Sequence, residues 1–421
     1  MYGFQQVLVG KNSELIAILK FLCEQSHKLT NMGIYYARQL YFKSKKTIGK
    51  FYLEKVYKNN NHYKVIHSQA AQQILRTLAE SFRYYYGLIK AYTEGEITKI
   101  PRIPNYRKKG GMATFSYPKQ GLKLKGNQIR VPLGKTCKRW FGLDCFYIYK
   151  PSNLEFNSLK ELRILPINRC FYWEFVYEKE VTIPQLNQDN GLGIDHGLNN
   201  WLTCVSNVGN SLIVDGKHLK SMNSWYNKQI STIKENKPTE LWSNRLAEIT
   251  EKRSRQMLDG INKVIRIVIN HCLENNIGTI VFGWNKRQKN EIKLGKKNNS
   301  EFVQIPIARL KERIAQLSQE YGIIFIETEE SYTCRGEWPF APTFLDGDYP
   351  PIYGEKLGAG ARTQVPSKEA PTLRANDWKP SGRRTKRGLY RTGNNCFVNA
   401  DCKVAANIIR KVSTKLGLDL S

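Results

Sequence analysis

The stretch over residues 191–200 (GLGIDHGLNN) holds the first side chain that could do chemistry. A short apolar run ends in one carboxylate, Asp195, and the chain then turns near Gly197 into a strand-like run over residues 201–206. A third such run covers residues 211–215, so we predict three antiparallel strands with the acid on the first. A carboxylate here suits a hard metal ion, but an ordinary exposed Asp in a hairpin explains the segment equally well.

The charge of the whole chain narrows the choice of partner. The 421 residues include 66 Lys and Arg against 36 Asp and Glu, which gives a formal net charge of +30. Because each cation placed against a phosphate releases a condensed counterion, such an excess favours a polyanionic partner. The cations are interleaved with 23 Tyr along the chain, which favours nucleic acid over a membrane surface or a general effect on solubility.

The nine cysteines are odd in number and form no Cys-x-x-Cys pair. This favours reduced thiols in a cytoplasm over a disulfide framework, and neither Cys nor the six His stand at the spacing of a structural zinc site. The first residues do not resemble a signal segment, and no apolar run approaches the length of a membrane span. We therefore expect a soluble, cytoplasmic protein with no membrane partner.

Hydrophobic periodicity predicts the elements that position Asp195. Alternating strands over residues 113–177 indicate a small β-barrel, which a strand near residues 7–9 completes. Three or so helices over residues 14–92 are then an insertion into the barrel, and their basic and aromatic residues suit nucleic-acid contact or a solvated polar face. The three strands around Asp195 are followed by a long helical stretch at 221–275 interrupted near Pro238, a strand at 277–282, a helix at 307–321, a strand at 323–327 and a helix at 400–412.

This order of elements is the ribonuclease H-like topology, and four motifs resemble the RuvC motifs of the TnpB (OrfB) family. The motifs are residues 193–200 (GIDHGLNN), 280–285 (IVFGWN), 332–333 (YT) and 399–407 (NADCKVAAN). The family comprises transposon-encoded relatives of type V CRISPR effectors and of Fanzor proteins, and the resemblance covers nearly all of the chain. It implies a multidomain fold, α/β plus β-barrel, with a ribonuclease H-like (RuvC) nuclease domain. The predicted domains are a wedge-like β-barrel (1–12 and 98–188), a helical recognition domain (13–97), the RuvC domain (189–330 and 396–421) and a degenerate zinc-finger-like insertion that binds target nucleic acid (331–395).

Nucleases of this type use several carboxylates to hold two divalent ions about 4 Å apart, one activating water and one stabilising the leaving oxygen. Mg²⁺ suits such a site. The resemblance implies Asp195 as the bridging ligand and Asp401 as the second acid. An Asp stabilised by a helix N-terminus is the alternative for Asp401. Lys403 stands where the family often has Asn.

The third acid departs from the family pattern, because Gly283 stands where a Glu normally ends the second motif. Some members compensate with a later Glu just ahead of a Tyr-Thr pair, and this chain has Glu327, Glu329 and Glu330 before that pair. We predict Glu330 as the third acid, with Glu329 next. The alternatives are three exposed acids at a strand end, or an inactive site.

The family usually places four zinc-binding cysteines between the third and fourth motifs, and here only Cys334 and Cys396 remain, so we expect no zinc. The candidates for nucleic-acid contact share a basic or amide side chain. For phosphate contact these are Arg253, Arg255, Lys263, Arg383, Arg384, Lys386 and Arg387; for the adjacent motif in DNA these are Gln72 and Gln73, with the neighbouring Arg76. A solvated basic run and ordinary surface glutamines remain alternatives.

The resemblance implies an RNA-guided, Mg²⁺-dependent DNA endonuclease that cuts double-stranded DNA beside a short adjacent motif. Its guide RNA would come from its own element, and the protein would act in a prokaryotic cytoplasm at the nucleoid. Two alternatives are a nuclease-dead, RNA-guided DNA-binding protein, suggested by Gly283, and a general basic RNA-binding protein. Whether the protein is a monomer or a dimer is left open.

Overall fold

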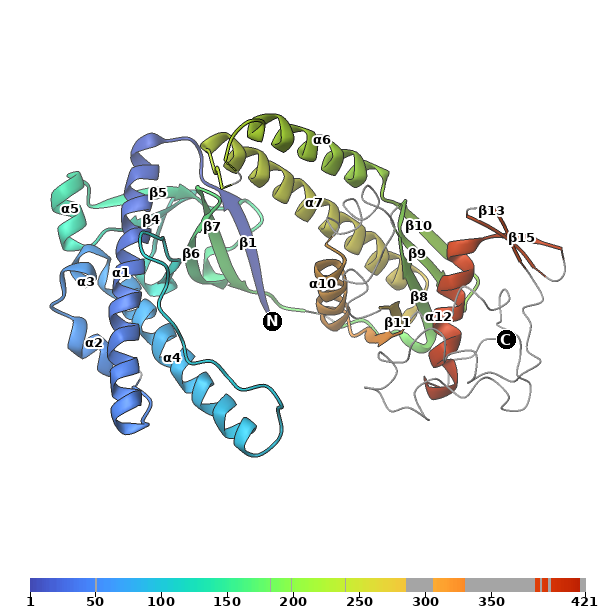
Figure 1. The fold of residues 1–421 in the computed structure, drawn as a ribbon, viewed down its shortest axis with the longest axis horizontal. Coiled ribbons are helices and arrows are strands. Elements are labelled where there is room, and N and C mark those ends of the chain that lie inside the picture. Colours follow the sequence, from blue (N-terminus) through green and yellow to red (C-terminus); the bar gives the residue numbers. More distant parts are fainter. Residues whose placement is uncertain are drawn as a thin grey trace. The chain divides into compact units, whose positions relative to one another are not determined.

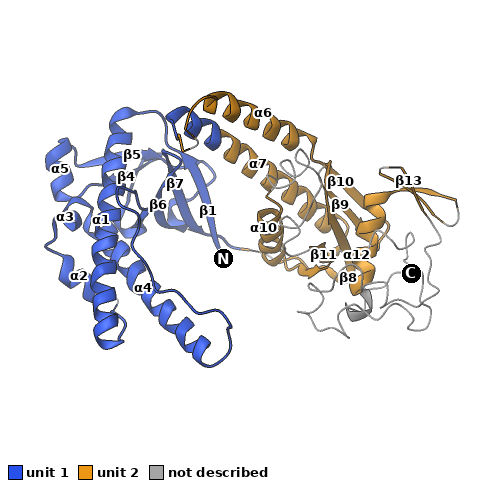
Figure 2. Cartoon of the chain, viewed as in Figure 1, with its two compact units in different colours: residues 1–180, 242–251 blue, residues 181–241, 252–421 orange. Residues whose placement is uncertain are grey.

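The computed structural model describes residues 1–49, 51–181, 183–197, 199–238, 240–284, 306–329, 383–386, 388–392 and 395–416. The chain forms two compact units, residues 1–180 with 242–251 and residues 181–241 with 252–421 (Figure 2). The finer division into four domains stays a prediction. Within the described ranges, no helix is both long and apolar enough to cross a membrane.

The strands of the first unit form two sheets. β1 (Tyr2–Leu8), β7 (Cys170–Glu178), β6 (Leu159–Ile167) and β2 (Phe115–Pro118) pair in that order, and β3 (Lys123–Lys125), β4 (Gln128–Pro132) and β5 (Cys145–Tyr149) form the other sheet. The prediction that an N-terminal strand joins the strands of residues 113–177 is confirmed, since β1 lies antiparallel to β7.

The prediction of a closed barrel is wrong for the described strands, because the two sheets share no strand pairing. A 3₁₀ turn, η1 (Lys119–Gly121), separates β2 from β3, and helix α5 (Lys135–Phe141) separates β4 from β5. Alternating strand patterns indicate which segments are extended but not which edges meet, so the sequence could not distinguish one closed barrel from two open sheets.

The helical block is inserted between β1 and β2, as predicted. It consists of α1 (Ser13–Ser44), α2 (Tyr52–Tyr57), α3 (Asn61–Val65) and α4 (Ser68–Thr93) (Figure 1). Asn12 begins α1 by accepting a hydrogen bond from the Leu15 amide at 3.0 Å. Helices and strands share one apolar core, in which Leu22 and Leu75 are fully buried together with Phe175 of β7.

The second unit is built on a five-stranded mixed sheet. Its order is β10 (Ser211–Asp215), β9 (Asn200–Ser206), β8 (Asn187–His196), β11 (Ile277–Gly283) and β12 (Ile324–Thr328). β8, β9 and β10 pair antiparallel as predicted, and β11 pairs parallel with both β8 and β12. β8 begins with a polar segment in which Asn187 is in register with Ile277 of β11, and a register shift separates this pair from Thr279 and Gly191.

Helices cover both faces of this sheet. They are α6 (Lys217–Lys234), α7 (Asn244–Glu274), α10 (Ile307–Glu320) and α12 (Ala400–Leu416), and a small sheet of β13 (Arg383–Lys386), β14 (Leu389–Arg391) and β15 (Phe397–Asn399) leads into α12 (Figure 1). Strand alternation divides the faces. Ile194 and Ile280 join an apolar core with α7 and α10, whereas Val281 packs with Ile408 and Val412 of α12.

Candidate functional site

Asp195 lies on the face of the sheet that α12 covers. Its neighbour Ile194 is buried in the core on the α7 side, and alternation turns Asp195 the other way. Gly193, two residues earlier, faces α12 so closely that a Cβ atom there would stand 2.2 Å from the backbone oxygen of Ala405. Asp195 is half-buried and stands opposite the buried Thr203 of β9.

Asp401 lies in the first turn of α12, where two side chains hold it. Asn399 accepts hydrogen bonds from the amides of Asp401 at 2.8 Å and Cys402 at 3.3 Å, so it acts as the cap of the helix. Asn200 of β9 donates from Nδ2 to Oδ2 of Asp401 at 2.9 Å. The interpretation of the sequence did not single out Asn200, although it belongs to the same motif as Asp195.

The carboxylates of Asp195 and Asp401 both act electrostatically on the thiol of Cys402. Burial raises the pKa of the Cys402 thiol to about 11, and the negative charges of Asp401 and then Asp195 contribute to that rise. A carboxylate disfavours the thiolate of Cys402 only when the two groups are near each other. The contact of Gly193 with α12 and the hydrogen bond from Asn200 of β9 to Asp401 place Asp195 and Asp401, which lie far apart in the sequence, on one side of the sheet.

His196, the residue after Asp195, has a different role. Its ring is buried on the opposite face, where it makes edge contacts with Phe282 at 5.8 Å and Trp284 at 5.9 Å between ring centroids. It thus packs in the core and does not point toward the two acids.

Gly283 stands beside Asp195 on the face that α12 covers. Phe282 is in parallel register with Ile194, and Gly283 is in register with Thr328 of β12. The Trp284 amide donates to the Thr328 carbonyl at 2.8 Å, which continues the pairing beyond Gly283. A glycine at this point supplies no ligand, so a third acid would have to come from another segment.

The described acids at the end of β12, Glu327 within the strand and Glu329 just after it, differ in their surroundings. Oε1 of Glu327 accepts from Nζ of Lys311 on α10 at 2.5 Å, which places Glu327 on the face opposite Asp195. The backbone oxygen of Glu329 accepts from Nζ of Lys411 on α12 at 2.7 Å. Glu330 lies outside the described residues. Among those that are described, no three His, Cys, Asp or Glu side chains are grouped to hold a metal ion.

Asp195 and Asp401 nevertheless suit a divalent cation in part. Both present carboxylate oxygens, which Mg²⁺ prefers, and both lie on the side of the sheet that carries few apolar residues. The neighbouring thiol of Cys402 favours its neutral form, because burial and both acids raise its pKa. Two carboxylates beside a neutral thiol would suit a hard cation better than a soft one, and a site for two ions would need a further acid.

The predicted phosphate contacts on α7 differ from one another. Arg253 is half-buried, donates to Oδ1 of Asn223 at 2.8 Å and lies over the Tyr226 ring at 5.0 Å, so it ties α7 to α6. Burial lowers the pKa of its guanidinium. Lys263 forms a surface ion pair with Asp259 at 2.6 Å. Arg255 is exposed and remains accessible to a ligand.

The predicted contacts on α4 are engaged within the first unit. Arg76 donates to both carboxylate oxygens of Glu54, at 2.5 and 3.3 Å, and lies over the Phe51 ring at 5.2 Å. Burial raises the pKa of the Tyr63 hydroxyl, and a hydrogen bond from the Gln72 side chain partly offsets that rise. Gln72 and its neighbour Gln73 are both half-buried. A ligand could reach these amides only in part.

The basic run before α12 forms part of a hairpin. Arg383, Arg384 and Lys386 lie on β13, and all three are exposed. Arg387 lies outside the described residues, as does Cys334, while Cys396 is exposed. The hairpin therefore presents a row of cations to solvent.

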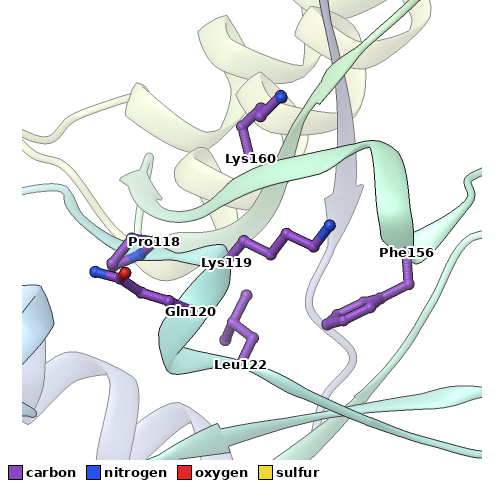
Figure 3. A pocket seen from close by; sticks show the side chains of 6 residues that line it. All are labelled: Pro118, Lys119, Gln120, Leu122, Phe156 and Lys160. Atoms are coloured by element: carbon purple, nitrogen blue, oxygen red, sulfur yellow. The ribbon is translucent and has the colours of Figure 1, made fainter.

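The first unit contains an open pocket of about 570 Å³ that the interpretation of the sequence missed. Its lining residues are Pro118, Lys119, Gln120, Leu122, Phe156 and Lys160 (Figure 3). Lys119 donates to the backbone oxygen of Asn157 at 2.5 Å, and Lys160 pairs with Glu178 at 2.5 Å. Both cations of the pocket thus already have partners within the unit.

The fold is similar to that of a Cas12f1. A Cas12f1 solved with sgRNA and target DNA matches at TM-score 0.52 and 13% identity, covering 94% of this chain and 83% of that one. A CRISPR-Cas12f ternary complex matches at TM-score 0.34 and 14% identity (94% and 81% covered), and a Cas12i1 R-loop complex before target cleavage at 0.38 and 10% (95% and 66% covered). Of these three, the Cas12f1 match is the one close enough to bear on the fold.

Residues 174–289 match the OrfB_IS605 family, which is described as a probable transposase. This match confirms the resemblance to the TnpB (OrfB) family that the motifs predict. The matched segment contains β8 to β11, and with them Asp195, Asn200 and Gly283. No curated protein sequence matches the chain.

Proposed function

We propose that the protein is an RNA-guided DNA endonuclease with a RuvC-type, two-metal site in its second unit. The observation that carries the proposal is that α12 covers the face of the sheet on which Asp195 lies: Gly193 of β8 contacts the α12 backbone at Ala405, and Asn200 of β9 donates to Asp401 at 2.9 Å. The OrfB match and the fold similarity to a Cas12f1 support it, as does the formal net charge of +30. We propose that it acts in a prokaryotic cytoplasm at the nucleoid.

Bound Mg²⁺ ions would activate water and stabilise the leaving oxygen in this chemistry. The chain's own residues would prepare the site. Asp195 and Asp401 would hold the ions with carboxylate oxygens, and the amide of Asn200 would keep the Asp401 carboxylate turned toward β9. Two acids are fewer than two ions need, so the proposal requires a third.

We propose Glu330 as that third acid. Glu327 faces α10, and Thr328 is in register with Gly283 on the α12 side, so an extended continuation of β12 would direct Glu330 to the side of Asp195 and Asp401. The hydrogen bond from Lys411 to the Glu329 carbonyl keeps the end of this segment near α12. Glu329 is the second choice.

Guide and target would contact basic surfaces of the chain. The Cas12f1 of similar fold was solved with sgRNA and target DNA. We propose that pairing between guide RNA and DNA selects the sequence, while the protein reads duplex shape and a short adjacent motif. Exposed Arg255 and the cations of β13 are the stronger candidates for phosphate contact, because Arg76 and Arg253 have partners within the protein.

The test is cleavage of a DNA library by protein co-expressed with RNA from its flanking locus, with and without Mg²⁺. We expect metal-dependent cuts beside one short motif, lost in Asp195→Ala, Asp401→Ala and Glu330→Gln. Glu327→Gln is the matched control, because Glu327 pairs with Lys311 on the other face, and it should cleave normally. Normal cleavage by either Asp variant would refute the site.

Gly283 favours one alternative, a protein that is guided by RNA and binds DNA but has lost its nuclease activity. This alternative predicts guide-dependent binding without cuts in any metal. A general RNA-binding protein would instead bind matched and scrambled DNA targets alike in a filter-binding comparison. The proposed nuclease requires both sequence choice and cleavage.

A further inference from the structure

Lys403 has unusual surroundings for a lysine. It lies in the first turns of α12, two residues after Asp401, and its side chain is only 1% exposed. Its Nζ atom stands 3.8 Å from the centroid of the Tyr390 ring on β14. Tyr390 is itself 4% exposed, so the contact between ammonium and ring is shielded from water.

Such a contact has a clear energetic consequence. A buried ammonium is unfavourable unless other groups compensate for its lost hydration. The face of an aromatic ring carries negative potential and attracts a cation within about 6 Å, most strongly where water is excluded. Replacing either partner therefore removes a favourable contact and leaves the other in a poorer environment.

The same region is tied together by the backbone. Tyr390 of β14 is in register with Val398 of β15, and the Ala400 amide donates to the Gly388 carbonyl at 3.0 Å. β15 continues directly into α12, where Asn399 caps the amide of Asp401. The contact between Lys403 and Tyr390 thus adds a direct link from β14 to the start of α12, beside the backbone connection through β15.

We infer that Lys403 and Tyr390 form a positioning pair, whose cation–π contact fastens the small sheet of β13 to β15 onto the start of α12. The pair holds the capped first turn, and with it Asp401, in place. It also sets the direction from which the exposed cations of β13 approach α12. The effect on catalysis rests on the proposed nuclease function, whereas the effect on α12 does not.

Hydrogen exchange at the amides of Asp401 and Cys402 tests the pair in the full chain without metal or nucleic acid. Tyr390→Leu removes the ring, and Tyr390→Phe retains it. We expect exchange in the first turn of α12 to become roughly tenfold faster in Tyr390→Leu and to stay unchanged in Tyr390→Phe. The amides of residues 261–269 in α7, far along the chain, serve as an internal reference. Equal exchange in the two Tyr390 variants would overturn the inference.

A double-mutant cycle then tests the coupling between the two side chains. Lys403→Met keeps most of the volume and removes the charge, and it should accelerate the same exchange by a similar factor. The double variant Lys403→Met with Tyr390→Leu should be no faster than either single variant, because the same contact is lost only once. If the effects of the two single substitutions on the exchange rate were additive in the double variant, the inferred coupling between Lys403 and Tyr390 would be overturned. Should Lys403→Met not fold, Lys403→Arg, which keeps a cation for the ring, is compared with Lys403→Gln.

The catalytic consequence is measured on guide-matched DNA. We expect Tyr390→Leu to cut roughly tenfold more slowly and to require more Mg²⁺ for half-maximal rate, with Tyr390→Phe like the wild type. A slower rate without a changed Mg²⁺ requirement would contradict positioning of Asp401. If the wild type does not cleave at all, the proposed function fails, and the exchange experiment still decides the role of the pair.

Discussion

The two faces of the five-stranded sheet differ in what they contribute. On the face covered by α7 and α10, Leu192, Ile194, Ile280 and Phe282 are fully buried in a large apolar core. On the face covered by α12, the buried apolar cluster among the described residues consists of Val281, Ile408 and Val412, with the partly buried Val404 packed against it. Since apolar burial drives folding, the first face carries most of the stability and the second is free to hold acids.

On the α12 face, a close approach of the helix backbone to β8 compensates for the small number of buried apolar side chains. Gly193 lets the backbone of α12 lie directly against β8, so the helix is held with few large side chains. The polar contacts of Asn200, Asn399 and Lys403 then determine where its first turn lies. We expect stability to respond most to changes on the first face and Asp401 to respond most to changes on the second.

The largest effect on stability should come from the apolar face. Ile280→Ala removes a fully buried side chain and leaves a cavity between the sheet and α7, so we expect a loss of about 4 kcal/mol in the free energy of unfolding. Denaturant unfolding followed by circular dichroism measures it. Val281→Ala on the opposite face should lose about 2 kcal/mol. An equal loss in the two variants would contradict the comparison.

Gly193→Val should be the most damaging change on the α12 face. Its Cβ would meet the Ala405 backbone oxygen at 2.2 Å and Cγ1 of Ile409 at 2.6 Å, so α12 must move away from β8. We expect a loss of about 3 kcal/mol together with lost cleavage. Gly10→Val is the matched control, since a Cβ at Gly10 would meet no atom within 4 Å. Retained cleavage in Gly193→Val would show that α12 need not contact β8 closely.

Asn200→Ala should separate function from stability on the α12 face. It removes the donor to Oδ2 of Asp401 while leaving the core intact. We expect cleavage to slow roughly tenfold, equivalent to about 1.4 kcal/mol, with little change in unfolding. Single-turnover cleavage across a range of Mg²⁺ concentrations measures the effect. Asn262→Ala on exposed α7 is the control, and similar behaviour of both variants would remove Asn200 from the site.

The smallest perturbation is chemical labelling of cysteines. Burial raises the pKa of Cys272, on the apolar face, to about 12, so at pH 8 its reactive thiolate is on the order of one part in ten thousand. Cys396 is exposed. Iodoacetamide at pH 8 should therefore label Cys396 in the folded protein, and Cys272 only as the pH rises toward its pKa or after unfolding. Peptide mass spectrometry distinguishes them, and protection of Cys396 that a chelator abolishes would indicate a bound metal.

Periodicity was a good guide to the elements that have one buried face. The strands at 201–206 and 277–282 and the helix pair interrupted near Pro238 appear close to their predicted positions, because their apolar residues repeat with the period of the element. The closed barrel was wrong because its closure depends on pairing between strand edges, which side-chain patterns do not specify.

Site predictions depended on a different kind of information. Nothing in the sequence near Arg76 or Arg253 indicates that Glu54 and Asn223 occupy them, because these partners are distant in the chain. Likewise, the motif around Asp195 contains Asn200, but its role as a donor to Asp401 becomes visible only where β9 meets α12.

The sequence by itself determined the excess of cations that predicts a polyanionic partner, the order of strands and helices, and the acid-bearing motifs that resemble those of RuvC nucleases. These follow from net charge, local period and residue identity, which are properties of neighbouring residues along the chain. Only the tertiary structure decided that Asp195 and Asp401 share one side of the sheet, that Glu327 faces the other, and that Lys403 is buried against Tyr390. Those relations arise from packing between segments far apart in the sequence, and packing depends on shape and distance that no local pattern encodes.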